Sequence, residues 1–250
     1  MKTVEKTVDI LEAFLKYEGE VGVAELARLV GLNISTAHRI ISTLVKRGYL
    51  NQQQKRGKYS LAPKFLEFSN VVRQRMKIGE IALPFLDKLN KTINESVKLG
   101  VLDRDEVVCI DEIESSLQLR IFTKVGTRFP LHCTSAGKVF LAYMSEEEVE
   151  RYVKSKGLPY HTDNTIREYS KLKEELLTIR REGMAMDREE FDLGVKCISA
   201  PVKDGNGNLV ATVTVSGPST RLNKHRMQEI KVLVMDCSSE ISKAIGYNSK

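Results

Sequence analysis

Apolar residues in the first third of the chain recur at helical spacing. The first set lies at i, i+4, i+7 and i+11 and consists of Val4, Val8, Leu11 and Leu15. This spacing predicts an amphipathic helix over about residues 3–17. A short second helix is predicted over 24–30, which Gly31 would end in the C′ position. A third is predicted over 34–47, with an apolar face made by Ile34, Ala37, Ile41 and Leu44.

Two helices joined by a tight, glycine-containing turn are typical of a helix-turn-helix, whose second helix enters the major groove of DNA. The other face of the predicted third helix carries small polar and basic side chains: Ser35, Thr36, His38, Arg39, Ser42, Thr43 and Lys46. Small side chains let such a helix sit deep in the groove, and Arg39 could bind a guanine edge through two hydrogen bonds. We expect these residues and Arg28 to contact DNA.

The pattern changes to strand spacing after Gly48. Strands are predicted around Tyr49-Leu50 and Tyr59-Ser60-Leu61, and the polar segment between them would form a β-hairpin wing. The basic residues of this wing are Lys55, Arg56 and Lys58. Cations on a protruding loop suit contact with phosphates or with the minor groove. Residues 1–62 are therefore predicted to form a winged helix-turn-helix domain.

The rest of the chain alternates between helical and strand patterns. A helix over 63–77 is expected to link two domains or to pair with another subunit. Further helices are predicted over 78–92, 135–143, 146–154, 166–182 and 223–245. Strands are predicted over 97–101, 107–113, 119–123, 195–202 and 209–216, with a hairpin turn between the last two. Antiparallel strands framed by helices predict an α+β domain over 78–250.

Charge divides the chain in the same way. Between Leu26 and Leu66 there is no Asp or Glu, but there are eight Lys or Arg residues. The first 78 residues contain 14 basic and 7 acidic side chains, whereas the other 172 contain 25 and 26. A folded, acid-free basic surface indicates a polyanionic partner. The predicted helix fits B-DNA better than RNA, because the major groove of an A-form helix admits side chains poorly.

Composition gives no sign of a membrane segment, an export signal or a disulfide framework. No stretch approaches the ~18 apolar residues of a transmembrane helix, and the acidic residues of the first turns are unlike a signal peptide. The four cysteines lie far apart and form no CxxC pair: Cys109, Cys133, Cys197 and Cys237. We expect a soluble cytoplasmic protein with free thiols, no cofactor, no bound metal and no membrane partner.

Several motifs resemble those of IclR-type transcriptional regulators. In the first third they are Glu25-Leu26-Ala27, Gly31-Leu32, the run from Ser35 to Arg39, and the run from Leu44 to Leu50. Later they are Thr134 to Lys138, Gly183 to Asp187, Glu189-Glu190, Gly194 to Val202, Ser216-Gly217-Pro218 and Ile245-Gly246. This resemblance implies a GAF-like effector domain and a homodimer that can form a tetramer. It also implies a DNA-binding repressor controlled by a small molecule.

The resemblance further implies a small-molecule site in the second domain. The matching positions are Ser135, Ala136, Asp187, Cys197, Thr214 and Ser216. Ser135 and Ala136 would lie at a helix start, where unpaired N–H groups and the helix dipole attract an anion. Thr214 and Ser216 alternate along one strand and so face the same side. Because Asp187 would repel a carboxylate, we expect it to accept a hydrogen bond from a hydroxyl of an organic-acid effector.

Two other classes of function use the same residues. A metal- or thiol-redox-sensing regulator could use His132, Cys133 and Cys197, although nothing has zinc-finger spacing. A cysteine-dependent hydrolase could use Cys133 or Cys197 as nucleophile, with His132 and Asp187 as partners. His132 and Cys133 are adjacent, however, and would point apart in an extended chain. No HExxH, GxSxG or P-loop pattern is present, so we expect no enzymatic activity.

Overall fold

The computed structural model describes residues 2–17, 19–53 and 57–247. The chain divides into two compact units, Met1–Met76 and Lys77–Lys250. Each unit has its own apolar core, built only from residues of that unit. Among the described residues, no helix is both long and apolar enough to cross a lipid bilayer.

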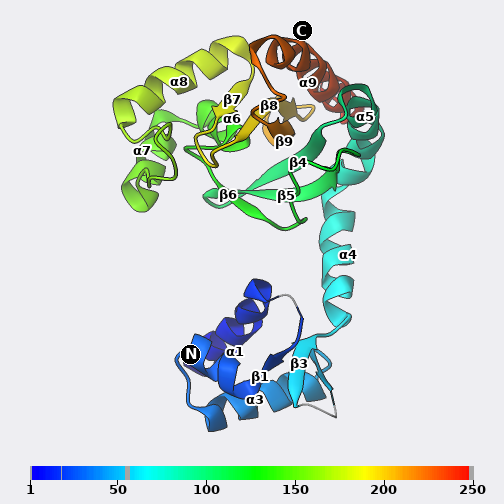
Figure 1. The fold of residues 1–250 in the computed structure, drawn as a ribbon, viewed down its shortest axis with the longest axis vertical. Coiled ribbons are helices and arrows are strands. Elements are labelled where there is room, and N and C mark those ends of the chain that lie inside the picture. Colours follow the sequence, from blue (N-terminus) through cyan, green and yellow to red (C-terminus); the bar gives the residue numbers. More distant parts are fainter. Residues whose placement is uncertain (1, 18, 54–56, 248–250) are drawn as a thin grey trace. The chain divides into compact units, whose positions relative to one another are not determined.

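The first unit is a winged helix-turn-helix followed by one further helix (Figure 1). Its helices are α1 (Lys2–Ala13), the short 3-10 helix η1 (Phe14–Lys16), α2 (Val23–Leu29), α3 (Ile34–Lys46) and α4 (Lys64–Met76). Its strands are β1 (Val21–Gly22), β2 (Leu50–Gln53) and β3 (Lys58–Leu61), paired antiparallel in the order β1-β3-β2. The predicted wing is therefore present, with β1 as an additional strand.

Two local signals define the turn between α2 and α3. Gly31 has a φ of 64°, the left-handed conformation that glycine adopts readily after a helix end. Asn33 then caps α3, because its side-chain oxygen accepts a hydrogen bond from the N–H of Thr36 at 2.8 Å. The turn places α2 against α3, and Leu26 and Ile41 are both fully buried in the core between them.

The apolar face predicted for the first helix is wrong in part. The structure buries Ile10, Ala13 and Phe14 of this segment in the core, and Leu11 is half-buried. Val4, Val8 and Leu15 are instead 68%, 45% and 78% exposed. The segment has two apolar faces, and contact with α2 and α3 selects one of them. Ile34, predicted on the apolar face of its helix, is also exposed, because it is the first residue of α3.

The second unit is an α+β domain built on one antiparallel sheet (Figure 1). The strands are β4 (Ser96–Asp103), β5 (Glu106–Ile113), β6 (Arg128–Pro130), β7 (Ala185–Arg188), β8 (Val195–Lys203) and β9 (Leu209–Pro218), in the order β6-β5-β4-β9-β8-β7. The helices are α5 (Ile78–Ile93), α6 (Ser135–Tyr143), α7 (Glu146–Lys156), α8 (Tyr169–Glu182) and α9 (Lys224–Ala244).

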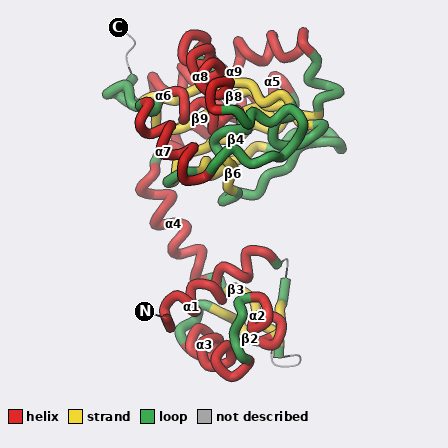
Figure 2. Tube along the Cα trace, turned by 90° about the vertical axis from the view of Figure 1, so that its left-hand side faces the viewer, coloured by secondary structure: helices red, strands yellow, loops and turns green. Residues whose placement is uncertain are grey.

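Alternation along the strands gives this sheet two different faces. One face carries aliphatic side chains such as Leu99, Val213 and Ile198, which pack with α5 and α9 into a single core (Figure 2). The other face carries Lys98, Thr214 and Ser199, and α6 packs against it. Polar residues in the interior of a sheet need partners or a ligand, so this second face is where a site is expected.

One predicted strand is misplaced in the sequence analysis. Residues 119–123 form no strand, and the strand that pairs with β5 is β6, in a segment for which no strand was predicted. Hydrogen bonds between its backbone and two side chains, Ser96 and Glu112, fix the 119–123 segment instead. The Ser96 hydroxyl donates to the carbonyl of Ile121 at 2.5 Å, and the N–H of Thr123 donates to the carboxylate of Glu112 at 2.9 Å. The strand β7 was also not predicted. The other predicted strands and helices are present with shifted ends.

Candidate nucleic-acid interface and ligand cavity

The face of α3 opposite the core consists of the predicted DNA contacts. Ser35, His38, Arg39, Ser42, Thr43 and Lys46 are exposed, and Thr36 is half-buried. Some of their polar atoms are engaged within the helix: Thr43 donates to the carbonyl of Arg39 at 3.0 Å, and the Ser42 hydroxyl lies 3.5 Å from Nδ1 of His38. Within the described ranges, neither Arg39 nor Lys46 takes part in a salt bridge. Both charges therefore face solvent and remain available to DNA.

The wing and α2 extend this basic surface. Arg28 is exposed on α2, and Lys58 is exposed at the start of β3, where it pairs with Gln53. Lys55 and Arg56, predicted at the wing tip, lie outside the described residues. At the far end of the wing, the Lys64 ammonium donates to the carbonyl of Arg47 at 3.0 Å.

A cavity of about 340 Å³ opens on the polar face of the six-stranded sheet. Its lining includes all six residues predicted as effector contacts: Ser135, Ala136, Asp187, Cys197, Thr214 and Ser216. Sheet register explains four of these positions, because Asp187 pairs with Cys197 and Cys197 pairs with Ser216, two residues after Thr214. Cross-strand partners and residues two apart face the same side, so these side chains reach the cavity from three adjacent strands.

The start of α6 completes this wall of the cavity. The Ser135 hydroxyl lies 2.7 Å from that of Ser199, which lies 2.7 Å from that of Thr214, so three hydroxyls form a buried chain. Thr134 caps the helix by accepting the N–H of Gly137 at 3.1 Å. Among the described residues, the N–H groups of Ser135 and Ala136 have no acceptor, as is usual in a first helical turn. They form a small anion-attracting group at the cavity.

The close approach of α6 depends on a glycine. A Cβ atom at Gly137 would lie 2.4 Å from Cα of Leu131, which no packed side chain can occupy. The helix can therefore start directly against the backbone of the 131–134 segment, with Leu131 and Leu141 fully buried beside it. This contact fixes where Ser135 and Ala136 meet the sheet.

Asp187 is a buried carboxylate in the cavity wall. It is 3% exposed, it accepts the N–H of Glu190 at 2.7 Å, and burial raises its pKa to about 7. Glu190 lies behind it, with its carboxylate 2.6 Å from the ammonium of Lys138, a residue that is fully buried. Glu175 makes a second ion pair with Lys138 at 3.1 Å. This buried network holds the loop after β7, whose Glu190 N–H binds Asp187, against α6 and α8.

The two cysteines of the alternative interpretations are protonated thiols. Cys197 accepts a hydrogen bond from the Ser216 hydroxyl at 3.2 Å, and burial raises its pKa to about 11. Cys133 is fully buried, and burial raises its pKa further still. A nucleophilic cysteine needs a thiolate, which both environments oppose. The geometry therefore gives no support to a cysteine-dependent hydrolase.

The metal-site alternative takes a different form from the one predicted. Ligand atoms of His132, Cys133 and His161 lie within 4.8 Å of one another, whereas Cys197 belongs to the cavity. The expectation that His132 and Cys133 point apart is wrong, because residues 131–134 are bent rather than extended. Both ring nitrogens of His132 already have partners, the carbonyl of Pro159 at 3.0 Å and the hydroxyl of Tyr152 at 3.4 Å. Binding a metal would break one of these contacts.

Sequence reasoning missed part of the cavity. Lys98 lines it from β4 and is only 8% exposed. Apolar walls come from Val107, Phe129, Phe191 and Val195. Alternation along residues 97–101 does place Lys98 on the face opposite Val97 and Leu99. The sequence alone does not show that this face borders the cavity, because that follows from the pairing of β4 with β9.

Comparison with known proteins settles which family the chain resembles. The IclR helix-turn-helix domain matches residues 3–54, and the model described as bacterial transcriptional regulator IclR C-terminal matches residues 71–243. The chain belongs to the IclR family of transcriptional regulators. The family resemblance and the winged helix-turn-helix plus α+β architecture predicted from the sequence are thereby confirmed. As an IclR-family member, the chain is a DNA-binding transcriptional regulator.

Individual relatives cover nearly the whole chain. It is 31% identical over 249 residues to the transcriptional repressor IclR of Escherichia coli, covering 98% of this chain and 90% of that protein. The crystal structure of Thermotoga maritima IclR superposes with a TM-score of 0.82 at 32% identity, covering 99% and 100% of the two chains. An IclR homologue from Microbacterium hydrocarbonoxydans, crystallised with 4-hydroxybenzoate, shares the fold at 22% identity, with a TM-score of 0.86 and coverage of 97% and 98%.

Proposed function

We propose that this IclR-family chain is a repressor that binds a near-palindromic DNA operator as a homodimer, under control of a small organic acid. Residues 1–62 would bind DNA, 63–77 would link the domains, and 78–250 would bind the effector. The observation that carries the proposal is that one chain has both an exposed, acid-free recognition helix and a cavity of about 340 Å³ with convergent polar groups. The Escherichia coli relative is named a transcriptional repressor, and this supports repression rather than activation.

In this proposal α3 reads bases and the wing positions the protein. Arg39 is exposed, forms no salt bridge with any residue that the structure describes, and is the candidate for bidentate contact with guanine. The small side chains on either side of it let the helix approach the groove floor. Arg28, Lys46 and Lys58, with Lys55 and Arg56 of the wing tip, would contact phosphates, which supply affinity without sequence preference.

Exposed apolar residues in the first unit support a homodimer. On α1 and η1 they are Val4, Val8 and Leu15. On α4 they are Leu66, Phe68, Val71 and Val72, and these four are 50–66% exposed. None of the residues of α4, all of which are described, is buried. Covering such surface with a second copy stabilises the dimer by about 25 cal/mol per Å² of apolar area removed from water. A two-fold dimer also places two copies of α3 on two half-sites. Two such dimers could associate into a tetramer.

The cavity supports an organic acid as effector. Its volume of about 340 Å³ is in the range of small-ligand sites. The N–H groups of Ser135 and Ala136 would attract a carboxylate, Asp187 would accept a hydroxyl, and Cys197, Thr214 and Ser216 would line the remaining polar wall. The rings of Phe129 and Phe191 would cover an apolar body. The 4-hydroxybenzoate bound by the Microbacterium hydrocarbonoxydans homologue combines these three chemical features.

Operator binding measured with and without acids tests the proposal. Full-length protein is titrated against a fluorescent duplex selected from a random library, and 4-hydroxybenzoate, pyruvate and gluconate are added in turn. A true effector should change operator affinity by about 1–3 kcal/mol, and saturating operator should change the affinity for that acid by the same factor. Selection of no duplex, or selected duplexes whose binding ignores every acid that binds the protein, would contradict the proposal.

A further inference from the structure

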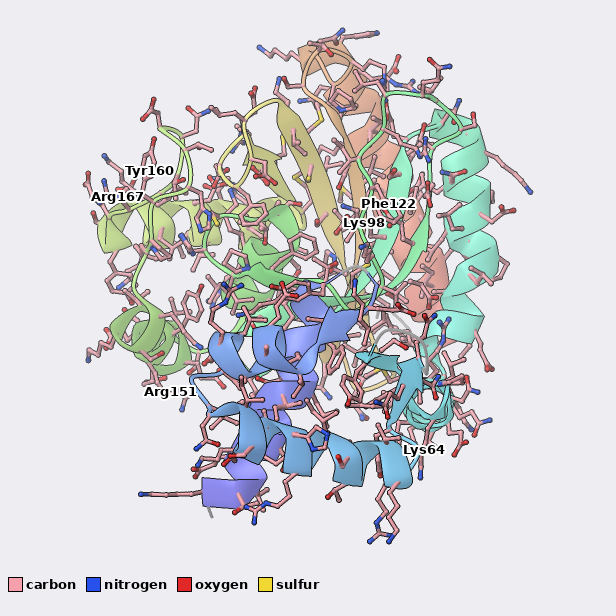
Figure 3. The ribbon with its side chains drawn as sticks, turned by 60° about the horizontal axis from the view of Figure 1, so that its bottom comes forward. Lys64, Lys98, Phe122, Arg151, Tyr160 and Arg167 are labelled. Atoms are coloured by element: carbon pink, nitrogen blue, oxygen red, sulfur yellow. The ribbon has the colours of Figure 1, made fainter. Side chains whose placement is uncertain are left out.

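Lys98 places a positive charge in the cavity lining without a salt bridge to any acidic side chain that the structure describes. The side chain projects from β4, is 8% exposed and lines the cavity. Figure 3 labels Lys98 together with Phe122, a residue of the segment after β5 that also lines the cavity. In the part of the chain that the structure describes, Lys98 makes neither a salt bridge nor a side-chain hydrogen bond. A buried ammonium without a partner is unfavourable, so this position suits an anionic ligand.

The acidic cross-strand neighbour of Lys98 attracts its charge but forms no salt bridge with it. Glu112 is the cross-strand partner of Lys98 on β5. Its carboxylate accepts the N–H of Thr123 with both oxygens, at 2.9 and 3.1 Å, and does not come within salt-bridge distance of the ammonium. Lys98 Nζ lies instead 5.7 Å from the centre of the Phe129 ring. The ammonium is thus left beside an aromatic wall, where a carboxylate attached to an apolar body would fit.

The start of α6 borders the same part of the cavity. Thr214 is the cross-strand partner of Lys98 on β9, and its hydroxyl is linked through Ser199 to Ser135. Lys98 and the free N–H groups of the helix start therefore flank Thr214 from two sides. Asp187 lies on β7, three strands away from β4 in the sheet order, which separates the two backbones by about 14 Å. Lys98 and Asp187 therefore lie on strands at opposite edges of this part of the sheet, and the start of α6 meets the sheet between them at Ser199 on β8.

We propose that Lys98 and the start of α6 form a carboxylate subsite, and that Lys98 makes the cavity select a carboxylic acid over its neutral amide. The inference rests on the proposed effector function and specifies the ligand class. The carboxylate binds at the β4 side, the body lies between Phe129 and Phe191, and a hydroxyl reaches Asp187 on the β7 side. The ligand is accordingly a hydroxycarboxylic acid with an apolar body.

Matched acid and amide pairs test this assignment on the full chain. The probes are 4-hydroxybenzoate with 4-hydroxybenzamide, pyruvate with pyruvamide, and gluconate with gluconamide, each titrated by calorimetry. For any pair that binds, the parent should prefer the acid by at least tenfold. Lys98→Met should remove that preference while leaving affinity for the amide within threefold, and Lys98→Arg should restore it. Lys224→Met is the control, because Lys224 is an exposed lysine at the start of α9 outside the cavity lining, and it should keep the preference.

The outcomes separate this inference from the proposed function. If acids bind and Lys98→Met keeps the parental preference, the subsite is wrongly assigned although an organic acid still binds. Equal losses of acid and amide affinity in Lys98→Met would also overturn it, since a folding defect rather than charge recognition would then explain the change. If the amides bind as well as the acids in the parent, the cavity does not recognise charge and the inference fails. If no compound of the panel binds, the organic-acid effector itself is refuted.

Discussion

Replacing Asp187 with asparagine should stabilise the protein at alkaline pH much more than at acidic pH. Burial raises the pKa of Asp187 from its ordinary value of 3.8 to about 7. Between these values the folded protein keeps a proton on Asp187 that the unfolded chain has released. The folded state then binds more protons, so the stability of the parent falls as pH rises from about 4 to about 7. Above pH 7 the cost is constant, and below pH 4 it disappears.

The magnitude follows from the size of that shift. About three pKa units at about 1.4 kcal/mol each give a cost on the order of 4 kcal/mol at pH 8. At pH 5, roughly one unit above the ordinary value, the cost is between about 1 and 2 kcal/mol. Asparagine carries no charge, and its side-chain oxygen can still accept the N–H of Glu190. The advantage of Asp187→Asn over the parent should therefore grow by about 2–3 kcal/mol between pH 5 and pH 8.

Thermal unfolding followed by circular dichroism at pH 5, 6, 7 and 8 measures this difference. For a unit of this size, each kcal/mol shifts Tm by about 2–4 °C, so the gap should widen by about 5–10 °C. Glu190, whose pKa burial raises, titrates in both proteins, so its contribution largely cancels. Asp192→Asn is the control, because Asp192 lines the same cavity but is exposed. A gap that stays constant from pH 5 to pH 8 would refute the idea that burial keeps Asp187 protonated.

Three further predictions concern DNA, the buried ion pairs and α4. Arg39→Ala should weaken operator binding by about 1–3 kcal/mol and relax base preference in anisotropy titrations. Lys55→Ala or Arg56→Ala should instead weaken all duplexes alike and lower the salt slope by about 0.9 per lost phosphate contact; identical behaviour of all three variants would contradict this division. Lys138→Met should cost on the order of 3–5 kcal/mol in denaturant melts, because it strands the buried Glu190 carboxylate, and adding Glu190→Gln should recover most of it. A Lys138→Met variant as stable as the parent would show that the ion pair between Lys138 and Glu190 does not stabilise the fold. Inserting two glycines near Asn70 should abolish the effector response of operator binding if α4 transmits it, with dimerisation checked by light scattering; an unchanged response excludes that role.

The DNA-binding unit could be predicted almost entirely from local signals. Gly31 marks the turn between α2 and α3, and the polar run between Tyr49 and Tyr59 marks the wing. The buried face of α1 could not be predicted, since its segment offers two apolar faces. Only contact with α2 and α3 shows that Ile10 and Phe14, and not Val4 and Val8, lie in the core.

The second unit shows where sequence reasoning ends. Its six candidate contacts came from the family resemblance, and the structure brings them to one cavity. Lys98 was missed because its neighbours come from strands that pair across a long sequence separation, as in the register of Ser96 with Ser216. The edge strand β6 is only three residues long and depends on its pairing with β5, whereas the more apolar segment 119–123 satisfies its backbone through Ser96 and Glu112.

The buried hydroxyl chain of Ser135, Ser199 and Thr214 has three orders of its hydrogen atoms: in two of them both bonds run the same way along the chain, and in the third Ser199 accepts from both neighbours. Three hydroxyls carry three hydrogens, and two of them are used within the chain. In the two orders that run one way along the chain, the third hydrogen points out of the end towards which the chain is directed, either at Ser135 or at Thr214. Rotating all three hydroxyls together reverses the direction without moving a heavy atom. An acceptor bound at one end would thereby fix the hydrogen positions at the other, so that the wall of the cavity adapts its polarity to the ligand.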